Sequence, residues 1–173
     1  MIVLYILLGL IALILITALL VGTGWTFERS IVINASPDKV WLHTNSLAAN
    51  NAWSPWIEKD PNIKHQMSGT DGTPGATYSW QSDVKNVGEG SQTITSVTEK
   101  SSFNSRVDFI KPFKGTGNAS VLLTPEGSGT KVTWRMVSST PYPMNVIKIF
   151  GVIEKNLDKD FTVGLGKLKR LCE

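Results

Sequence analysis

The sequence contains very few of the residues from which metal sites and disulfide frameworks are built. It has one cysteine, Cys172, and two histidines, His43 and His65. One cysteine forms no internal disulfide, and one cysteine with two histidines falls short of the four ligands of a structural zinc site. Composition therefore excludes both internal disulfides and a structural zinc site. We expect no metal and no cofactor, and stability must come from a packed core.

The sequence also has no concentrated cluster of one charge, no motif for a catalytic nucleophile and no motif for nucleotide binding. Lysine and arginine number 17 against 14 aspartates and glutamates, a net charge of +3. Nucleic-acid-binding domains usually carry a concentrated basic stripe, so nucleic acid is not an expected partner. The motifs G-x-S-x-G, G-x-G-x-x-G and the Walker phosphate loop do not occur. Gly127–Lys131 has the wrong order for a phosphate loop and fits a hairpin turn. No catalytic residue is predicted.

Charged residues are absent from the first part of the chain. Every charged side chain follows Phe27, and residues 2–21 are almost entirely apolar. A helix of about 20 residues at about 1.5 Å each matches the roughly 30 Å of bilayer hydrocarbon. We therefore predict a single-pass transmembrane anchor over residues 1–24 and one further domain over residues 25–173.

Two other interpretations of this segment are weaker. A cleaved signal peptide would carry a basic residue before a shorter apolar run and a small-x-small cleavage site after it. A buried core helix would be shorter or amphipathic, whereas this segment is apolar on every face. Arg29 and Lys39 on the C-terminal side favour a cytoplasmic domain, although a difference of one or two charges leaves the other side of the membrane open.

The pattern changes to strands and short helices after the anchor. Phe27–Asn34 alternates and is rich in β-branched residues, which predicts a strand. Ser36 with Pro37 predicts the start of a short helix that runs to about Ser46. Residues 48–53 are expected to form another helical turn, which Pro55 ends.

The middle of the chain predicts an antiparallel sheet, because apolar residues alternate between turn-forming segments. The expected strands cover residues 75–80, 87–97, 102–110, 118–124 and 131–137. The last two strands form a hairpin through residues 125–130.

The C-terminal segment predicts one long amphipathic helix. Apolar residues recur at spacings of three and four from Val146 to Leu171, over about seven turns. The elements together predict an α+β fold, in which a curved antiparallel sheet of six to seven strands wraps around this helix. A concave apolar space between sheet and helix is the usual small-molecule site in such a fold.

An ordered set of segments resembles a known superfamily. The segments are residues 28–40, 53–56, 60–61, 75–80, 111–113 and 125–134. In this order they resemble the SRPBCC superfamily, also called START-like, polyketide-cyclase-like or helix-grip, in its membrane-anchored bacterial branch. The resemblance implies the helix-grip fold and a cavity for hydrophobic or amphipathic molecules such as lipids, quinones, hormones or polyketides. A minority of the superfamily are enzymes, and fold alone does not fix function.

The candidate ligand-binding residues are the side chains expected on the inner face of the sheet and on the C-terminal helix. They are Tyr78, Trp80, Gln92, Phe103, Ser105, Val107, Phe109, Val121, Leu123, Trp134, Met136, Phe150, Leu157 and Phe161. Large apolar residues of this kind often only fill a core. Gln92 and Ser105 are candidates to orient a polar group of a ligand, although a bond to the backbone would explain a buried serine equally well.

The functional prediction is a membrane-tethered, non-catalytic module that binds a lipid-like or quinone-like molecule. The alternative is a cyclase or dehydrase, which would need an acid–base group inside the pocket; a protein-interaction role is a third possibility. We further expect Trp80 to donate its indole N–H to a ligand, Gly69–Gly75 to be a mobile loop at the cavity rim, and both histidines to be exposed or capping residues.

Overall fold

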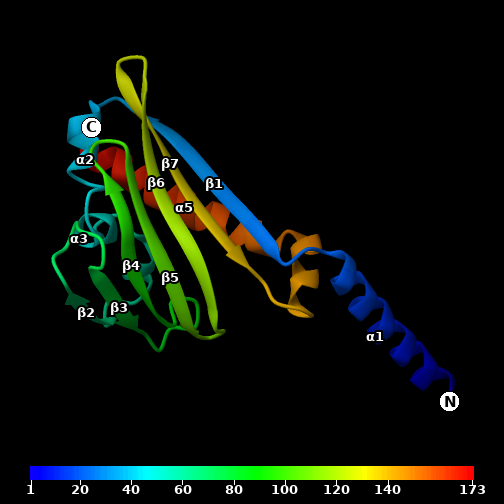
Figure 1. Ribbon diagram of the computed structural model, residues 1–173. Helices are drawn as coiled ribbons and strands as arrows, with labels where there is room; N and C mark the ends of the chain where they lie inside the picture. The colour runs from blue at the N-terminus through cyan, green and yellow to red at the C-terminus, as the bar shows by residue number, and fades with distance from the viewer.

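The computed structural model describes residues 1–173 and contains one seven-stranded sheet, with strand order β1-β7-β6-β5-β4-β3-β2 (Figure 1). All strand pairs are antiparallel. The elements are α1 (Ile2–Leu20), β1 (Gly24–Ile33), α2 (Pro37–Trp41), α3 (Leu47–Asn51), α4 (Pro55–Lys59), β2 (Lys64–Ser68), β3 (Thr77–Gln81), β4 (Glu89–Thr98), β5 (Ser102–Lys111), β6 (Gly115–Glu126), β7 (Gly129–Ser139), the 3-10 helix η1 (Met144–Phe150) and α5 (Val152–Cys172). The predicted α+β helix-grip fold is confirmed.

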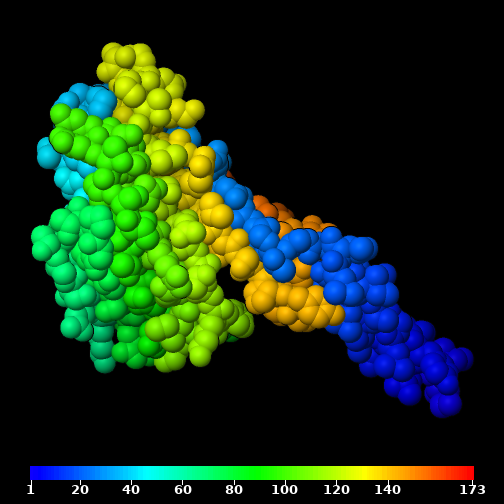
Figure 2. All heavy atoms as spheres, in the orientation of Figure 1, coloured from blue at the N-terminus to red at the C-terminus, as the bar shows by residue number.

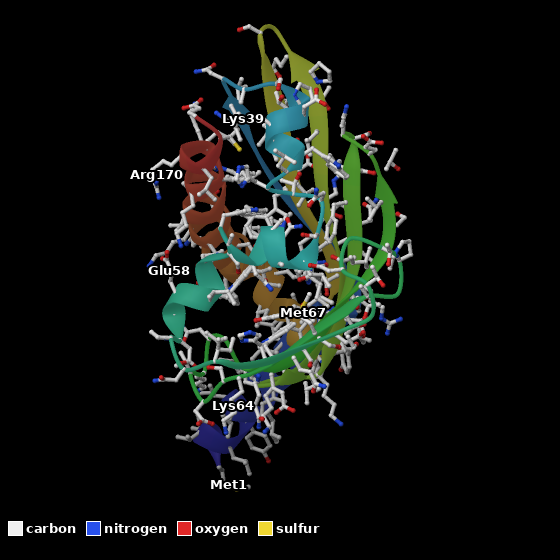
Figure 3. The ribbon with its side chains drawn as sticks, turned by 90° about the vertical axis from the view of Figure 1, so that its left-hand side faces the viewer. Met1, Lys39, Glu58, Lys64, Met67 and Arg170 are labelled. Carbon is white, nitrogen blue, oxygen red and sulfur yellow. The ribbon has the colours of Figure 1, made fainter.

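The core lies between the sheet and α5, which runs along the concave side of the long strands (Figure 1). Alternation along the strands sets which side chains face it. Phe103, Ser105 and Val107 on β5 are buried, whereas Arg106 between them is exposed. A view turned by 90° shows α2, α3 and α4 filling the space between α5 and the green strands of the sheet, with Glu58 on the helix nearest to α5 (Figure 3).

An aromatic cluster centred on Trp134 joins the helices to the sheet. The Trp134 ring stacks on Phe161 of α5 at 4.0 Å between ring centroids and meets Trp53 edge-on at 4.8 Å. Gly164 makes this close approach possible, because a Cβ there would lie 2.8 Å from the Trp134 ring. The helix therefore packs directly onto an indole of β7.

One local prediction about the middle of the chain is wrong, and one strand lies outside the predicted set. Pro55 does not end a helix but begins one, since it occupies the first position of α4 after Ser54, where proline needs no N–H donor. The edge strand β2 was not predicted, because all five of its residues are exposed and none of them shows the alternation of a half-buried strand.

The predicted C-terminal helix is interrupted. Gly151 has a φ of +61°, a left-handed conformation that ends η1 at Phe150 and makes the chain change direction before α5. The regular spacing of apolar residues therefore extends across two elements, and only its part from Val152 onward lies on one helix.

The helix α1 projects away from the sheet, with the N-terminus at its far end (Figure 1). It is the one helix long and apolar enough to cross a membrane, a test that a signal sequence near the N-terminus also passes. Its C-terminal end contacts η1. The amide Nδ2 of the buried Asn145 donates to the carbonyls of Ala18 and Val21, and the Lys148 ammonium donates to those of Gly22 and Gly24.

Candidate functional site

A cavity of about 420 Å³ lies between the concave side of the sheet and the helices. It is lined by 28 residues, of which 17 are hydrophobic. They come from the strands, from α3, α4 and α5, and from the connections between these elements, so the site exists only after the sheet has closed around the helices. This size and composition are typical of small-molecule sites.

Most of the residues predicted from the sequence line this cavity. They are Tyr78, Trp80, Gln92, Phe103, Ser105, Val107, Phe109, Val121, Trp134, Met136, Leu157 and Phe161. Two do not. Leu123 is buried in the core outside the cavity, and Phe150 lies on η1 with 68% of its surface exposed, because Gly151 turns η1 away from the axis of α5.

The two predicted polar residues, Gln92 and Ser105, are hydrogen-bonded to each other. Gln92 Nε2 donates to Ser105 Oγ at 2.8 Å, and Ser105 Oγ donates to the carbonyl oxygen of Ala119 at 3.5 Å. The Ser105 hydroxyl therefore has partners within the protein, which agrees with the alternative that this serine is buried because it bonds to the backbone. Any ligand contact from this pair would involve the Gln92 side chain.

Two other polar atoms of cavity-lining residues are buried without a partner. One is the hydroxyl oxygen of Tyr78, on a side chain that is 5% exposed. Burial raises the pKa of Tyr78, so the phenol keeps its proton at neutral pH and stays able to donate.

The other atom is Oδ1 of Asn50, on α3. Its Nδ2 donates to the carbonyls of Thr44, at 3.1 Å, and Ser46, at 2.7 Å, and these two bonds fix which end of the amide is nitrogen. The free atom is therefore an acceptor. No pattern in the sequence pointed to Asn50, because only the packing of α3 brings it to the cavity.

The expectation that Trp80 donates to a ligand is not met. Its Nε1 donates to the carbonyl of Val87 at 3.2 Å and so ties the connection between β3 and β4 to the ring. Gly90 on the neighbouring strand leaves room for that ring, since a Cβ there would lie 2.7 Å from it. Trp80 is a wall of the cavity rather than a donor to its contents.

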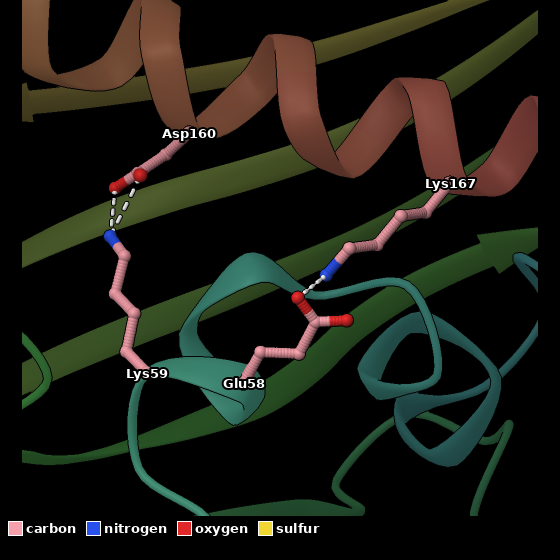
Figure 4. Close-up of polar contacts among 4 residues, drawn as sticks. All are labelled: Glu58, Lys59, Asp160 and Lys167. Atoms are coloured by element: carbon pink, nitrogen blue, oxygen red, sulfur yellow. Dashed lines mark hydrogen bonds and ion pairs between the residues drawn. The ribbon is translucent and has the colours of Figure 1, made fainter.

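Two of the charged residues that line the cavity, Asp160 and Lys111, are held in ion pairs. Lys59 Nζ lies 2.7 Å from both carboxylate oxygens of Asp160, and Lys111 pairs with Glu89 at 2.9 Å. A neighbouring pair, Lys167 with Glu58, joins the same two helices as the first (Figure 4). α4 is thereby held against α5 at two points.

The mouth of the cavity is defined by the lining residues that are exposed to solvent. These are Lys85, Asn86, Lys111, Pro112 and Asn156. They lie in the connection between β3 and β4, at the turn between β5 and β6, and in the second turn of α5. The cavity opens between these three segments.

The predicted rim loop Gly69–Gly75 does not line the cavity. The Asp71 carboxylate in this loop accepts from the backbone N–H groups of Leu47 and Ala48, which ties the loop to the start of α3. His65 is exposed on β2, where its ring stacks on Tyr78 at 5.6 Å between centroids.

Sequence reasoning missed the contribution of the helices and loops to the wall. The additional apolar lining residues include Trp25, Trp53, Trp56, Ile57, Ile63 and Val87. Trp53 and Trp56 lie on either side of Ser54 and Pro55, and because Pro55 begins α4 and does not end a helix, the direction of these two side chains differs from what the sequence indicates. The signal in the sequence was the presence of two tryptophans, Trp53 and Trp56, in a turn-forming segment that precedes the predicted sheet.

Several solved structures share the fold of this chain. The di-domain ARO/CYC protein StfQ from the steffimycin biosynthetic pathway is 10% identical with a TM-score of 0.64, over 87% of this chain and 51% of that one. The Aha1 dimer from Colwellia psychrerythraea is 16% identical with a TM-score of 0.59, over 86% of this chain and 96% of that one. Ara h 8.0201 is 14% identical with a TM-score of 0.56, over 84% and 97%. These likenesses show the fold alone.

No curated protein matches the chain. A family model does match, over residues 24–173, and its description is polyketide cyclase / dehydrase and lipid transport. This match covers the whole sheet and the C-terminal helix, and it confirms the superfamily that the ordered sequence segments resembled. The chain therefore belongs to the polyketide cyclase / dehydrase and lipid transport family.

Proposed function

We propose that the chain is a membrane-anchored binding protein whose cavity holds one hydrophobic molecule that carries a polar group. The observation that carries the proposal is the pair of partnerless buried polar atoms, Tyr78 Oη and Asn50 Oδ1, on residues that line a mainly apolar cavity. A buried polar group without a partner costs about 1–3 kcal/mol. A ligand whose hydroxyl or similar group reached either atom would relieve part of that cost.

The chemistry of the two atoms restricts the polar group. Asn50 Oδ1 only accepts, so it calls for a donor on the ligand. The Tyr78 hydroxyl donates or accepts, and its raised pKa keeps it neutral. A neutral alcohol, phenol or hydroquinone fits this pair better than a carboxylate, which would leave Asn50 without a donor.

The anchor is supported by the way α1 joins the domain. The Asn145 amide is buried and donates only to carbonyls at the end of α1. Cleavage of α1 as a signal peptide would leave that buried amide without its partners. The uncharged segment of residues 2–21 supports the same assignment. We further propose that the folded domain lies on the cytoplasmic side of the membrane, which Arg29 and Lys39 favour.

A binding role is favoured over catalysis by the state of the ionisable groups. Asp160, the one carboxylate that lines the cavity, is paired with Lys59, and the raised pKa of Tyr78 keeps its phenol protonated, so neither is free to act as a base. Lys85, the one lining charge without an ion pair, is exposed at the mouth. The family's enzymes supply the alternative, a cyclase or dehydrase acting on a hydrophobic substrate. That alternative needs a free acid–base group next to the bound molecule.

The proposal is tested by identifying what travels with the protein. The full chain is purified in detergent, examined by native mass spectrometry, and then extracted with organic solvent for analysis of the extract. We expect one small amphipathic molecule per protein. Returning this molecule to the purified protein separates the two functions: an unchanged mass on incubation supports binding, whereas conversion to a product supports the enzyme.

A further inference from the structure

Exposed apolar side chains gather at the end of the domain from which α1 leaves. On η1, Met144, Ile149 and Phe150 are exposed by 51%, 54% and 68% of their surfaces. At the turn between β5 and β6, Phe113 is exposed by 74%. Figure 1 shows η1 beside the end of α1 and this turn at the same end of the sheet. We call these four side chains the rim surface.

The position of the rim surface relative to α1 is fixed by hydrogen bonds. Asn145 and Lys148, both on η1, donate to four carbonyls between Ala18 and Gly24. η1 therefore cannot move away from the C-terminal end of α1 without breaking these bonds. If α1 spans the bilayer, that end lies at the boundary of the hydrocarbon and places η1 in the headgroup layer.

The exposed apolar residues of η1 continue those of α1. Leu19 and Leu20, in the last turn of α1, are exposed by 73% and 82%. Single exposed apolar residues are ordinary, whereas a group of them contiguous with a membrane-spanning helix is typical of an interfacial contact. This continuity favours a lipid surface over a protein partner as the occupant.

The charged residues around the rim surface favour contact with anionic lipid, but their net charge is too small to supply most of the attraction. Lys85, Lys114 and Lys155 form no ion pair in the protein. Asp83 and Glu154 lie in the same segments, so the excess of positive charge is small. Apolar insertion must therefore supply most of the attraction, and anionic lipid adds to it.

The mouth of the cavity lies at this same end. Of its exposed residues, Pro112 precedes Phe113 in the chain, and Asn156 lies one turn of α5 beyond Val152. Figure 2 shows a notch between the atoms of the β5–β6 turn and the orange atoms of η1. The side chains of the rim surface thus lie on both sides of the region into which the cavity opens.

We propose that the rim surface inserts into the headgroup layer and seats the mouth of the cavity on the bilayer, so that a lipophilic ligand enters from the membrane without crossing water. This inference rests on the anchoring of α1 in the proposed function. It adds a second membrane contact, made by the folded domain itself, and it names the membrane as the source of the ligand.

The test measures the depth of single labelled positions in the full chain. Phe113→Cys and Phe150→Cys are labelled with bimane in a Cys172→Ser background and reconstituted into vesicles of three parts phosphatidylcholine to one part phosphatidylglycerol. Ser128→Cys, at the tip of the β6–β7 turn, is the matched control at the far end of the sheet. We expect spin-labelled lipid to quench positions 113 and 150 at least threefold more than position 128.

The outcomes separate this inference from the anchoring on which it rests. Release of the protein from the vesicles by carbonate would refute the anchor itself. Retention of the protein, with equal and weak quenching at all three positions, would overturn the rim surface while leaving the anchor in place. Disulfide cross-links between two copies of the unlabelled Phe113→Cys or Phe150→Cys variant, without quenching of the labelled one, would assign the surface to a second copy and would also overturn it. Circular dichroism of each labelled variant confirms that the fold is retained.

Discussion

Replacing Tyr78 by phenylalanine removes the buried hydroxyl of a cavity-lining residue and leaves the ring, which stacks on His65 and Trp80, in place. The hydroxyl has no partner in the protein, so its removal gives up no hydrogen bond there. A partnerless buried group costs about 1–3 kcal/mol, and we expect the ligand-free variant to be stabilised by about 1 kcal/mol. For a chain of this size that corresponds to a rise in Tm of about 2–4 °C.

Binding should change in the opposite direction. A hydrogen bond from the Tyr78 hydroxyl to a ligand is worth about 1 kcal/mol, or about fivefold in affinity. The assay titrates the full chain in detergent with 2-naphthol, which carries a hydroxyl, and with naphthalene, which does not. Tyr78→Phe should weaken the binding of 2-naphthol about fivefold and leave that of naphthalene unchanged. Destabilisation of the ligand-free variant, or an equal effect on both probes, would refute the reasoning.

Three further predictions concern packing, reactivity and the anchor. Gly164→Ala should destabilise the fold by about 1–2 kcal/mol in chemical denaturation, because its Cβ would lie 2.8 Å from a core indole ring, whereas Gly166→Ala, with nothing within 4 Å, should be neutral or stabilising. Burial raises the pKa of Cys172, so the folded thiol should react with a thiol reagent at pH 8 far more slowly than the denatured chain, and the rate should increase as the pH rises through that higher pKa. Asn145→Ala should speed proteolysis between residues 18 and 24, because it removes two hydrogen bonds to the end of α1.

Alternation along the strands was enough to predict the inner face of the sheet. Phe103, Ser105 and Val107 face inward because side chains of a strand point alternately to its two sides, whatever the details of the fold. The same rule failed for β2, whose residues are all exposed and carry no apolar periodicity. An edge strand of this kind is recognised only from its partner, β3.

The helices were harder to predict because their direction depends on single residues. The spacing that placed Phe150 on the long helix is real, but the left-handed conformation of Gly151 redirects η1 and moves that side chain to the surface. Asn50 reaches the cavity only through the packing of α3, a short helix whose orientation no local pattern sets. The polar atoms of the site were therefore less predictable than its apolar walls.

The central claim is that the molecule carried by this protein lies inside the cavity. Ala119 lines the cavity and Ala48 is exposed on α3, so Ala119→Phe fills the space and Ala48→Phe is its matched control. The measurement is the molar ratio of bound molecule to protein in native mass spectra of the full chain, with thermal unfolding to verify that both variants are folded. We predict a ratio near the wild-type value for Ala48→Phe and a loss of at least tenfold for Ala119→Phe. Equal ratios in two folded variants would contradict the account.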